Sequence, residues 1–593
     1  MSEIIIGIDL GTTNSEVAVV ENGKVTIIED QGDKMLPSFV GISDNNELLV
    51  GESAKNQYIL YPERSIKSIK RKMGEDSKIN MAGQDYSPQE ISAIILKRLK
   101  AIAEAYLKQS VSKAVITVPA YFSDTQRQAT REAGEIAGLE VMRIINEPTA
   151  AALSYETAHK AHKKILVYDL GGGTFDVSVV GVEDDVVEVL ASHGNNQLGG
   201  DDFDAKIIEH ILQHLDEKYP GLDVSQSRKA IARIGRAAEL AKCNLSDNPF
   251  AAIQEEYLEE HDGAPVHLSL ELSRNDYEVM IDDYVEETLE AVHTALTGAK
   301  LTVSDIDEIL LVGGSTRTPL IGERLQEKFK LQPHAEIDPD LCVAAGAAIQ
   351  GAMIAGSDVS AVLVDITPYT YGTSALGNLG GMMYEHKYIP IIHKNTPLPV
   401  SKSEVFYTLY DGQKVVEVDV YQGEATDALD NIEIGMFNIE GLSDVPEGNE
   451  IMVKLDLDLD GVLNVKAWEK CTGLEKSIVI ENAIARFAGA ELETARQRIE
   501  HIFDTKEQTA DDGFIEAHSQ TEASEITRQH QAVIQAEALV EKTQRMLDQA
   551  SNDDREDMQR LMGILKQAIA DNDITGLQEP EAELADILYY LES

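Results

Sequence analysis

The sequence predicts a multidomain chain in which an α/β part, an antiparallel β part and an α-helical part follow one another (α/β + β + α). Apolar strands alternate with helical stretches as far as residue 356, which is typical of an α/β domain. Apolar and charged residues then alternate with a period of two, and an apolar seam with a period of seven follows. At 593 residues the chain also exceeds the size that one hydrophobic core serves.

The α/β part is expected to cover residues 1–356. The strand Ala114–Val118 precedes a helix for which Ser123 is the expected N-cap. The next strand ends at Asn146-Glu147-Pro148, where the proline suits a first helical turn. Glu147 then lies at a strand-to-helix edge, where α/β proteins place chemistry, although such a corner can also simply cap a helix.

Two glycine-rich hairpins dominate this part of the chain. Asp169-Leu-Gly-Gly-Gly-Thr-Phe-Asp176 joins two apolar strands, and Asp9-Leu-Gly-Thr-Thr-Asn-Ser15 does the same near the N-terminus. Glycines let the backbone approach a ligand, and their N–H groups can converge on an anion. Carboxylates such as Asp169 and Asp176 would repel a phosphate unless a divalent cation lay between, so magnesium held through waters is expected.

Two such hairpins indicate two related halves that clasp one phosphate chain, although each alone is more often just a turn. A third glycine turn, Leu311–Pro319, follows an apolar strand and would close over the other end of a nucleotide. The three turns together favour nucleotide binding.

The remaining boundaries follow from composition. Residues 357–366 form a linker whose apolar run, Ala361–Ile366, either docks somewhere or is the first strand of the next domain. Residues 367–481 alternate as antiparallel strands and predict a sandwich that serves as a binding module. Residues 482–593 predict a helical bundle: Ile526, Val533, Val540 and Leu547 are spaced by seven along one long helix, and the helices Met558–Ile569 and Glu581–Leu591 follow.

Composition excludes several partners. The formal net charge of −52 argues against DNA, RNA or an anionic membrane as a partner. The three cysteines, Cys243, Cys342 and Cys471, lack the spacing of a zinc site or a disulfide framework, which fits a reducing compartment. No signal-peptide core or membrane-spanning run is found, so a cytoplasmic protein is expected, mainly as a monomer.

Six ordered motifs match one family. The chain resembles the 70-kilodalton heat-shock chaperones of the DnaK type across nearly its full length. The motifs are Asp9–Ser15, Val118–Phe122, Ile144–Ala152, Asp169–Asp176, Leu198–Asp204 and Leu311–Arg317. The resemblance implies an actin-like ATPase domain, a docking linker, a sandwich that grips extended peptides and a helical lid.

The resemblance also implies roles for individual residues. Lys70, Glu147, Asp169 and Thr174 would surround the attacking water and the γ-phosphate of ATP, with Asp9 and Asp169 around Mg²⁺ and its waters. K⁺ is a second candidate ion. Further nucleotide contacts are expected from Gly11, Thr12, Thr13, Gly171, Gly172, Gly173, Gly199, Gly200, Glu239, Lys242, Ser246, Gly313, Gly314, Ser315, Arg317 and Asp340.

The resemblance implies a peptide cleft and an interdomain relay as well. Leu376 and Leu409 would arch over the peptide, with Phe406, Val416 and Val418 in the pocket. Tyr369, Tyr371 and Thr373 replace commoner small or aliphatic residues of the family, which alters the expected peptide preference. Pro119, Arg143 and Asp365 match positions of the relay between domains.

The implied function is that of an ATP-dependent molecular chaperone. It would bind and release extended hydrophobic segments of unfolded client proteins, with a slow ATPase stimulated by peptide and by a J-domain co-chaperone, and with a GrpE-type nucleotide exchange factor as a further partner. The segment between Lys70 and Val118 and the lid are short, which is similar to the HscC-like bacterial branch. An actin-like polymerising ATPase and a sugar kinase are the alternatives, but the first leaves residues 367–593 without a role and the second lacks a sugar site.

Overall fold

The computed structural model describes residues 4–159, 162–183, 186–261, 263–334, 338–357, 362–472, 475–479, 490–511, 552–570 and 580. The chain divides into two compact units, Met1–Thr505 and Lys506–Ser593. The predicted boundaries at residues 356, 366 and 481 fall inside the first unit and stay predictions.

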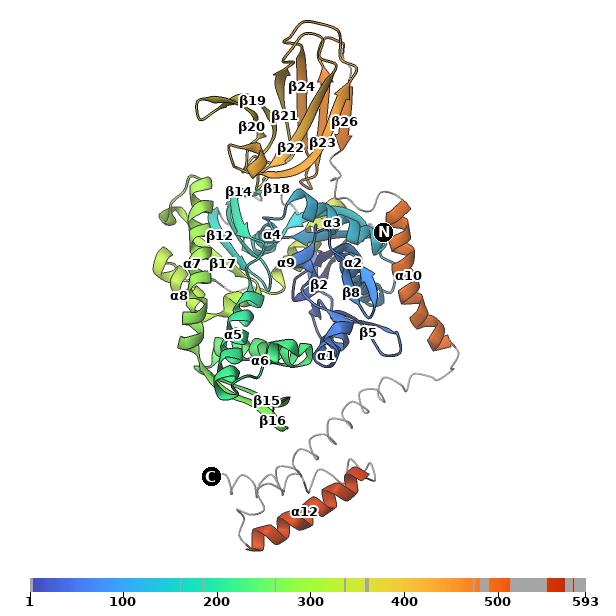
Figure 1. Ribbon diagram of the computed structural model, residues 1–593, viewed down its shortest axis with the longest axis vertical. Coiled ribbons are helices and arrows are strands. Elements are labelled where there is room, and N and C mark those ends of the chain that lie inside the picture. Colours follow the sequence, from blue (N-terminus) through green and yellow to red (C-terminus); the bar gives the residue numbers. More distant parts are fainter. Residues whose placement is uncertain are drawn as a thin grey trace. The chain divides into compact units, whose positions relative to one another are not determined.

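Two sheets with the same construction form the α/β part (Figure 1). The first has the order β11-β10-β1-β2-β3, and the second has the order β17-β12-β13-β14-β18. Their strands are β1 (Ile6–Asp9), β2 (Asn14–Glu21), β3 (Lys24–Ile27), β10 (Lys113–Val118), β11 (Glu140–Asn146), β12 (Lys163–Leu170), β13 (Phe175–Glu183), β14 (Val186–Asn195), β17 (Glu308–Val312) and β18 (Val362–Val364). In each sheet an antiparallel hairpin, β1–β2 or β12–β13, has a parallel neighbour on its first strand. This repeat agrees with the two related halves that the glycine hairpins predict.

Helices α4 (Glu147–His159) and α9 (Cys342–Ile354) join the two halves. Both are rich in alanine and α9 also carries two glycines, so their backbones come very close: a Cβ on Gly346 would lie 1.8 Å from the carbonyl oxygen of Ala150. Their apolar residues are buried together with strands of both sheets. The two phosphate hairpins are therefore held on one rigid centre.

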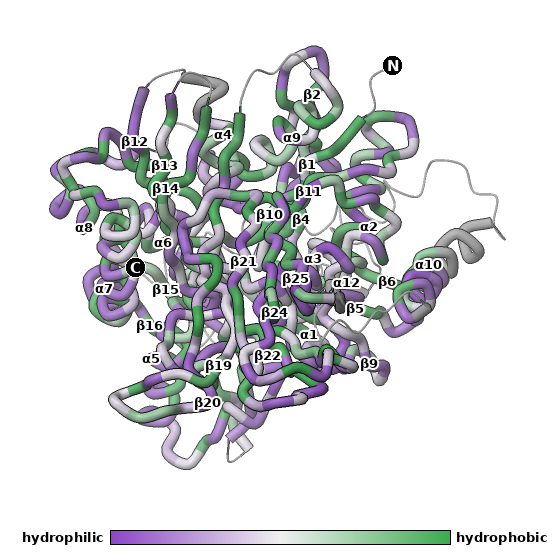
Figure 2. Tube along the Cα trace, turned by 90° about the horizontal axis from the view of Figure 1, so that it is seen from above, coloured by the Kyte–Doolittle hydropathy of each residue, from purple (hydrophilic) through white to green (hydrophobic). Residues whose placement is uncertain are grey.

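Further helices complete the α/β part, some of them packed on the two large sheets and others on smaller strands beside them. They are α1 (Glu52–Leu60), α2 (Pro88–Leu107), α3 (Asp124–Ile136), α5 (Gly200–Lys218), α6 (Arg228–Asp247), α7 (Arg274–Gly298) and α8 (Pro319–Phe329). The expected N-cap is present, because the Ser123 hydroxyl accepts a hydrogen bond from the Gln126 N–H and completes a capping box. Figure 2 shows how hydropathy is distributed over these elements: strands such as β1 and β13 are green and apolar, and α7 carries purple polar stretches.

Among the described residues, six short strands and the long hairpin β15–β16 complete the α/β part. They are β4 (Leu36–Pro37), β5 (Val40–Ile42), β6 (Leu48–Val50), β7 (Ser65–Ile66), β8 (Ile79–Met81), β9 (Gln84–Tyr86), β15 (Phe250–His261) and β16 (Ala264–Ser273).

A β-sandwich of two four-stranded antiparallel sheets follows, as predicted. One sheet has the order β20-β19-β22-β23 and the other β21-β24-β25-β26. The strands are β19 (Tyr371–Leu379), β20 (Met382–Ile392), β21 (Val400–Tyr407), β22 (Val415–Gln422), β23 (Ile432–Glu440), β24 (Glu450–Leu457), β25 (Leu463–Glu469) and β26 (Glu475–Val479). Residues of β24 alternate between half-buried and buried, so the period-two pattern faces one apolar side into the core.

The helical part is described only in two stretches. Helix α10 (Ala490–Asp511) buries Ala495 and Ile499 in the core of the first α/β sheet. Its Arg498 lies 4.3 Å from the centre of the Tyr86 ring and donates a hydrogen bond to the Asp85 carbonyl at 2.7 Å. Arg498 also forms an ion pair with Glu90 of α2 at 3.4 Å, so α10 is held on the β8–β9 hairpin and on the first turn of α2.

Helix α12 (Asn552–Ala570) lies in the second unit and agrees with a helix predicted from Met558 onwards. The predicted seam from Ile526 to Leu547 and the predicted helix Glu581–Leu591 lie outside the described residues. So does linker position Ala361. No helix among the described residues is long and apolar enough to cross a membrane.

Candidate functional site

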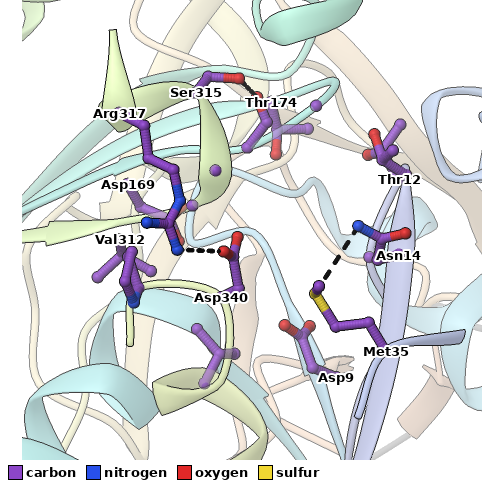
Figure 3. A pocket seen from close by; sticks show the side chains of 18 of the residues that line it. Asp9, Thr12, Asn14, Met35, Asp169, Thr174, Val312, Ser315, Arg317 and Asp340 are labelled. Carbon is purple, nitrogen blue, oxygen red and sulfur yellow. Dashed lines mark hydrogen bonds and ion pairs between the residues drawn. The ribbon is translucent and has the colours of Figure 1, made fainter. Parts of the chain in front are cut away.

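A cavity of about 640 Å³ lies where the three glycine turns meet (Figure 3). Asp9 and Thr12 come from the first hairpin, and Asp169 and Thr174 come from the second. Figure 3 shows Arg317 and Asp340 pointing toward one another on the side formed by the third turn, opposite Thr12 and Asn14. The sequence-predicted turns therefore converge on one space.

The two phosphate hairpins touch each other directly. A Cβ on Gly172 would lie 1.9 Å from the Thr13 hydroxyl, and one on Gly173 would lie 2.6 Å from the Thr12 methyl carbon. Only glycine allows this approach. Backbone N–H groups of both hairpins thus line one wall, as an anion-binding turn requires.

A buried lysine lies among carboxylates at the floor of the cavity. Lys70 donates a hydrogen bond to Glu147 and forms an ion pair with it, and both side chains are less than a tenth exposed. Burial alone lowers the pKa of Lys70, but the charges of Glu147, Asp9 and Asp169 outweigh it and raise the pKa overall. Lys70 is therefore a permanent cation that faces the cavity.

Burial disfavours the charged form of the carboxylates of the site. Burial, and to a lesser degree the neighbouring carboxylates, raise the pKa of Asp169 well above its usual value. Burial likewise raises the pKa of Glu147 to about 7, although Lys70 acts against it. A nearby cation would relieve this cost by favouring the charged forms.

Asp9 and Asp169 fit a magnesium ion that keeps its waters. Both end a strand at the cavity and supply carboxylate oxygen, the donor that magnesium prefers. Within the part of the chain that the structure describes, no three His, Cys, Asp or Glu side chains converge closely enough to bind a metal directly. An ion held mainly by water and phosphate oxygens, with these carboxylates around it, agrees with that arrangement.

The third turn closes the opposite side. Gly313 has a positive φ of 81° after β17, and the Ser315 hydroxyl donates to the Gly171 carbonyl at 2.9 Å. Arg317 pairs with Asp340 at 2.8 Å. Gly314 also lines the cavity, so all four predicted residues of this turn and Asp340 are brought together.

Helix α6 supplies the far end of the cavity. Glu239, Lys242 and Ser246 line it, as predicted, and Cys243 lies beside them. Lys55 of α1 reaches across to Glu239 at 3.4 Å, which links two parts of the chain over the cavity mouth.

Some predicted residues lie behind the cavity wall. Gly173, Gly199 and Gly200 do not line it. The Gly200 N–H donates to the Gly171 carbonyl at 3.0 Å, and a Cβ on Gly199 would lie 2.5 Å from the Gly173 nitrogen. These glycines therefore support the phosphate turn from behind.

Asp176 differs from its expected place. Its two carboxylate oxygens accept the N–H groups of Ala120 and Tyr121 at 3.1 and 3.0 Å, and the side chain is not part of the cavity lining. Antiparallel pairing sets Asp176 opposite Asp169, and the carboxylate serves to hold the loop after β10. The expectation that it faces the metal was wrong.

Glu16 is a cavity residue that the sequence did not reveal. It lies opposite Asp9 in the β1–β2 hairpin and is buried against it. Burial, followed by the charge of Asp9, raises its pKa well above the usual value. Its signal was present, because a charged residue opens the apolar strand Glu16–Val20 two positions after the turn, but a carboxylate at a strand end looks like an ordinary surface residue.

The linker docks, which resolves the open alternative. Strand β18 pairs in parallel with β14, at the edge of the sheet that carries the second phosphate hairpin. Asp365, which follows it, accepts hydrogen bonds from Asn146 at 2.9 Å and from Thr149 at 3.3 Å. The predicted relay residue Asp365 thus contacts the chain on both sides of Glu147.

The other predicted relay residues lie close to this contact. Pro119 is buried at the start of the loop that Asp176 holds. Burial raises the pKa of Asp365, and the charge of Arg143 opposes that rise. Arg127, which the sequence did not single out, donates both to Asn146 at 2.5 Å and to the Ala120 carbonyl at 3.0 Å.

The sandwich contacts the α/β part through the loop between β24 and β25. Asp460 accepts a hydrogen bond from Arg131 at 2.5 Å and from the Ile144 N–H at 3.0 Å. The Leu463 N–H donates to Asp124 at 3.3 Å. These contacts join elements more than 300 residues apart, and sequence analysis missed them.

The predicted peptide residues share one sandwich but differ in exposure. Leu376 and Leu409 are exposed at 41% and 58%, whereas Phe406 and Val416 are half-buried. Val418 is only 2% exposed and lies in the sandwich core, so it does not present a surface to a peptide as predicted.

The chain is similar to heat-shock chaperones over most of its length. A family model described as Hsp70 protein matches residues 5–592. Chaperone protein DnaK of Thermotoga neapolitana is 48% identical over 494 residues, which cover 81% of this chain and 80% of that protein. DnaK of Thermosipho africanus is 48% identical over 486 residues with the same coverage. The likeness to the HscC-like branch stays a prediction.

Proposed function

Because this chain belongs to the Hsp70 family and is an ATP-hydrolysing chaperone, we propose how its parts share that work. Residues 1–356 form an actin-like nucleotide-binding domain, residues 357–366 the linker, residues 367–481 the peptide-binding sandwich and residues 482–593 the helical lid. An actin-like polymerising ATPase is not favoured, since the family match extends through the sandwich to residue 592.

In the nucleotide site, the two hairpins bind the phosphates through backbone N–H groups and the hydroxyls of Thr12 and Thr13. Mg²⁺, when bound between Asp9 and Asp169, neutralises phosphate charge. Lys70 stabilises the negative charge on the transferring phosphoryl group, which a fixed cation in a buried site does effectively. Glu147 and Thr174 orient the attacking water.

The remaining cavity residues bind the nucleoside. Glu239, Lys242 and Ser246 contact the adenosine from α6, while Gly313, Gly314, Ser315 and Arg317 cover its other face. Gly199 and Gly200 act through the phosphate turn that they support.

One observation carries the proposed coupling: the linker strand β18 joins the sheet whose β12–β13 hairpin lines the cavity. The same sheet therefore contacts the linker and lines the proposed nucleotide site, so a change at one can alter the other. We infer that ATP favours this docked form, with α10 held on the β8–β9 hairpin and the cleft open. Hydrolysis then releases linker and sandwich, and the clamp closes on peptide.

The proposed partners follow from this cycle. Client proteins supply extended apolar segments to a cleft arched by Leu376 and Leu409, with Val416 in its pocket. A J-domain protein acts on the relay of Pro119, Arg143 and Asp365, and a GrpE-type factor speeds nucleotide exchange.

Peptide release with and without ATP tests the proposal. ATP should accelerate the release of a bound fluorescent peptide by more than tenfold, and Thr174→Ala should bind ATP and release peptide but lose single-turnover hydrolysis. Lys402→Ala, at an exposed position of β21, is a matched control for handling. Release that is indifferent to ATP in the wild-type chain would refute the coupling.

A further inference from the structure

Tyr369 does not lie in the peptide cleft, where the sequence placed it. It follows the linker at the start of the sandwich, and its ring lies on that of Tyr121, with the ring centres 4.6 Å apart. The Tyr369 hydroxyl donates a hydrogen bond to the Tyr121 carbonyl at 2.7 Å. Burial raises the pKa of Tyr369, so the hydroxyl keeps its proton and stays a donor.

The peptide groups around Tyr121 are held from the nucleotide-binding side as well. The Tyr121 N–H donates to Asp176 at 3.0 Å, and its carbonyl also accepts from the Asn196 side chain at 2.7 Å. Its ring meets the edge of His193 at 5.0 Å. Asp176, Asn196 and His193 all belong to the half of the domain that carries the second phosphate hairpin.

The path from this loop to the reacting groups is short. Asp176 lies opposite Asp169 in the β12–β13 hairpin, and Asp169 lines the nucleotide cavity. The neighbouring Phe122 ring lies 6.0 Å from the Lys70 ammonium group. A shift of the 119–122 loop would therefore move groups next to both Asp169 and Lys70.

We propose that Tyr369 is a positioning residue, whose hydroxyl fixes the Tyr121 carbonyl when the sandwich docks and so restrains the catalytic hairpin through Asp176. The inference rests on the proposed docking cycle and adds to it one side chain through which the sandwich acts on hydrolysis. The contact exists only while the sandwich is docked. Its loss on peptide binding frees the loop.

The substitution Tyr369→Phe separates the hydroxyl from the ring. It removes one hydrogen bond and keeps the contact between the two rings, whose planes are tilted by 42°. Tyr388→Phe is the matched control, because the Tyr388 hydroxyl also donates to a backbone carbonyl, that of Thr370 at 3.0 Å, but inside the sandwich. Both variants lose one buried hydroxyl from the same fold.

The measurement is single-turnover ATP hydrolysis of the full chain, with and without saturating peptide. Tyr369→Phe should raise the peptide-free rate about two- to tenfold, the range that one neutral hydrogen bond supplies. The peptide-bound rate should stay at the wild-type value, because the contact is absent there, so peptide stimulation falls by the same factor. Tyr388→Phe should leave the stimulation factor unchanged.

Two results would overturn the inference. If Tyr369→Phe keeps wild-type stimulation while Tyr369→Ala loses it, the ring packs and the hydroxyl does not position. If both tyrosine-to-phenylalanine variants lose stimulation alike, the effect is one of sandwich stability. If ATP does not change the rate of peptide release in the wild-type chain, the docking cycle itself is refuted. Wild-type peptide release is therefore measured before the variants. Asn196→Ala, which removes the second donor to the same carbonyl, should couple to Tyr369→Phe in a double-mutant cycle.

Discussion

The substitution Asp460→Asn should weaken docking of the sandwich on the nucleotide-binding domain. Asp460 is the acceptor of two hydrogen bonds across that contact, from the Arg131 guanidinium at 2.5 Å and from the Ile144 N–H at 3.0 Å. Asparagine keeps a carbonyl oxygen for Ile144 but removes the charge that faces Arg131. The perturbation therefore isolates one charge-assisted bond.

The magnitude follows from the surroundings of that bond. Hydrogen bonds to charged groups contribute about 1.5–3 kcal/mol, and every 1.4 kcal/mol is a factor of about ten. The side chains of Arg131 and Asp460 are 19% and 20% exposed, so solvent screens the pair in part. The lower end is therefore expected, a roughly tenfold smaller docking constant in ATP, and added salt should shrink the difference.

Hydrogen exchange of the β18 amides measures the docked fraction, because these groups pair with β14 only when the linker is docked. Asp458→Asn is the control. Asp458 accepts the N–H groups of Asp460 and Val462 at 2.9 Å within its own loop, and asparagine can still accept them. Equal exchange in wild type and Asp460→Asn, or an equal effect of both substitutions, would refute this account of the ion pair.

Three further outcomes are expected. Lys55→Ala should speed nucleotide release up to about fivefold in a stopped-flow chase, because it removes the ion pair to Glu239 over the cavity mouth, and a half-exposed pair contributes at most about 1 kcal/mol; an unchanged rate would contradict it. Val416→Phe fills the proposed pocket and should weaken peptide binding more than tenfold in a fluorescence titration, whereas normal affinity would move the pocket elsewhere. Burial raises the pKa of Asp124 to about 7, so the folded chain binds the proton more tightly than the unfolded chain, and this group lowers stability as pH rises from about 4 to 7. Asp124→Asn should therefore narrow the difference in melting temperature between pH 5 and pH 8, and an identical difference would show that the carboxyl is not the group responsible.

Features that depend on residues close together in the sequence could be predicted from local patterns. The acidic glycine hairpins at Asp9 and Asp169 are readable because close backbone approach and phosphate binding need those residue types within a few positions. The alternation in β24 is readable for the same reason, since strand geometry alone sets its period. Glu147 could be singled out from its strand-to-helix edge, whereas Asp365 needed the family resemblance, because a lone carboxylate in a linker carries no pattern.

The rest depends on contacts between distant segments. Arg131 and Asp460 are separated by 329 residues, and nothing near either one marks the other as its partner. For Tyr369, sequence analysis identified an unusual side chain but could not tell which of two domains that side chain contacts. Asp176 was misplaced because its partners, the N–H groups of Ala120 and Tyr121, come from a distant loop that no pattern near Asp176 reveals.

Docking of β18 has a consequence for self-association. While β18 is paired, it covers the β14 edge of the β17-β12-β13-β14 sheet and forms hydrogen bonds with the outward main-chain groups of β14. When the linker leaves, the outward N–H and C=O groups of β14 lose their partners. Such an unpaired strand edge can pair with any extended polypeptide, including the linker of a second molecule. Crowded, nucleotide-poor conditions should thus favour head-to-tail oligomers that ATP dissolves.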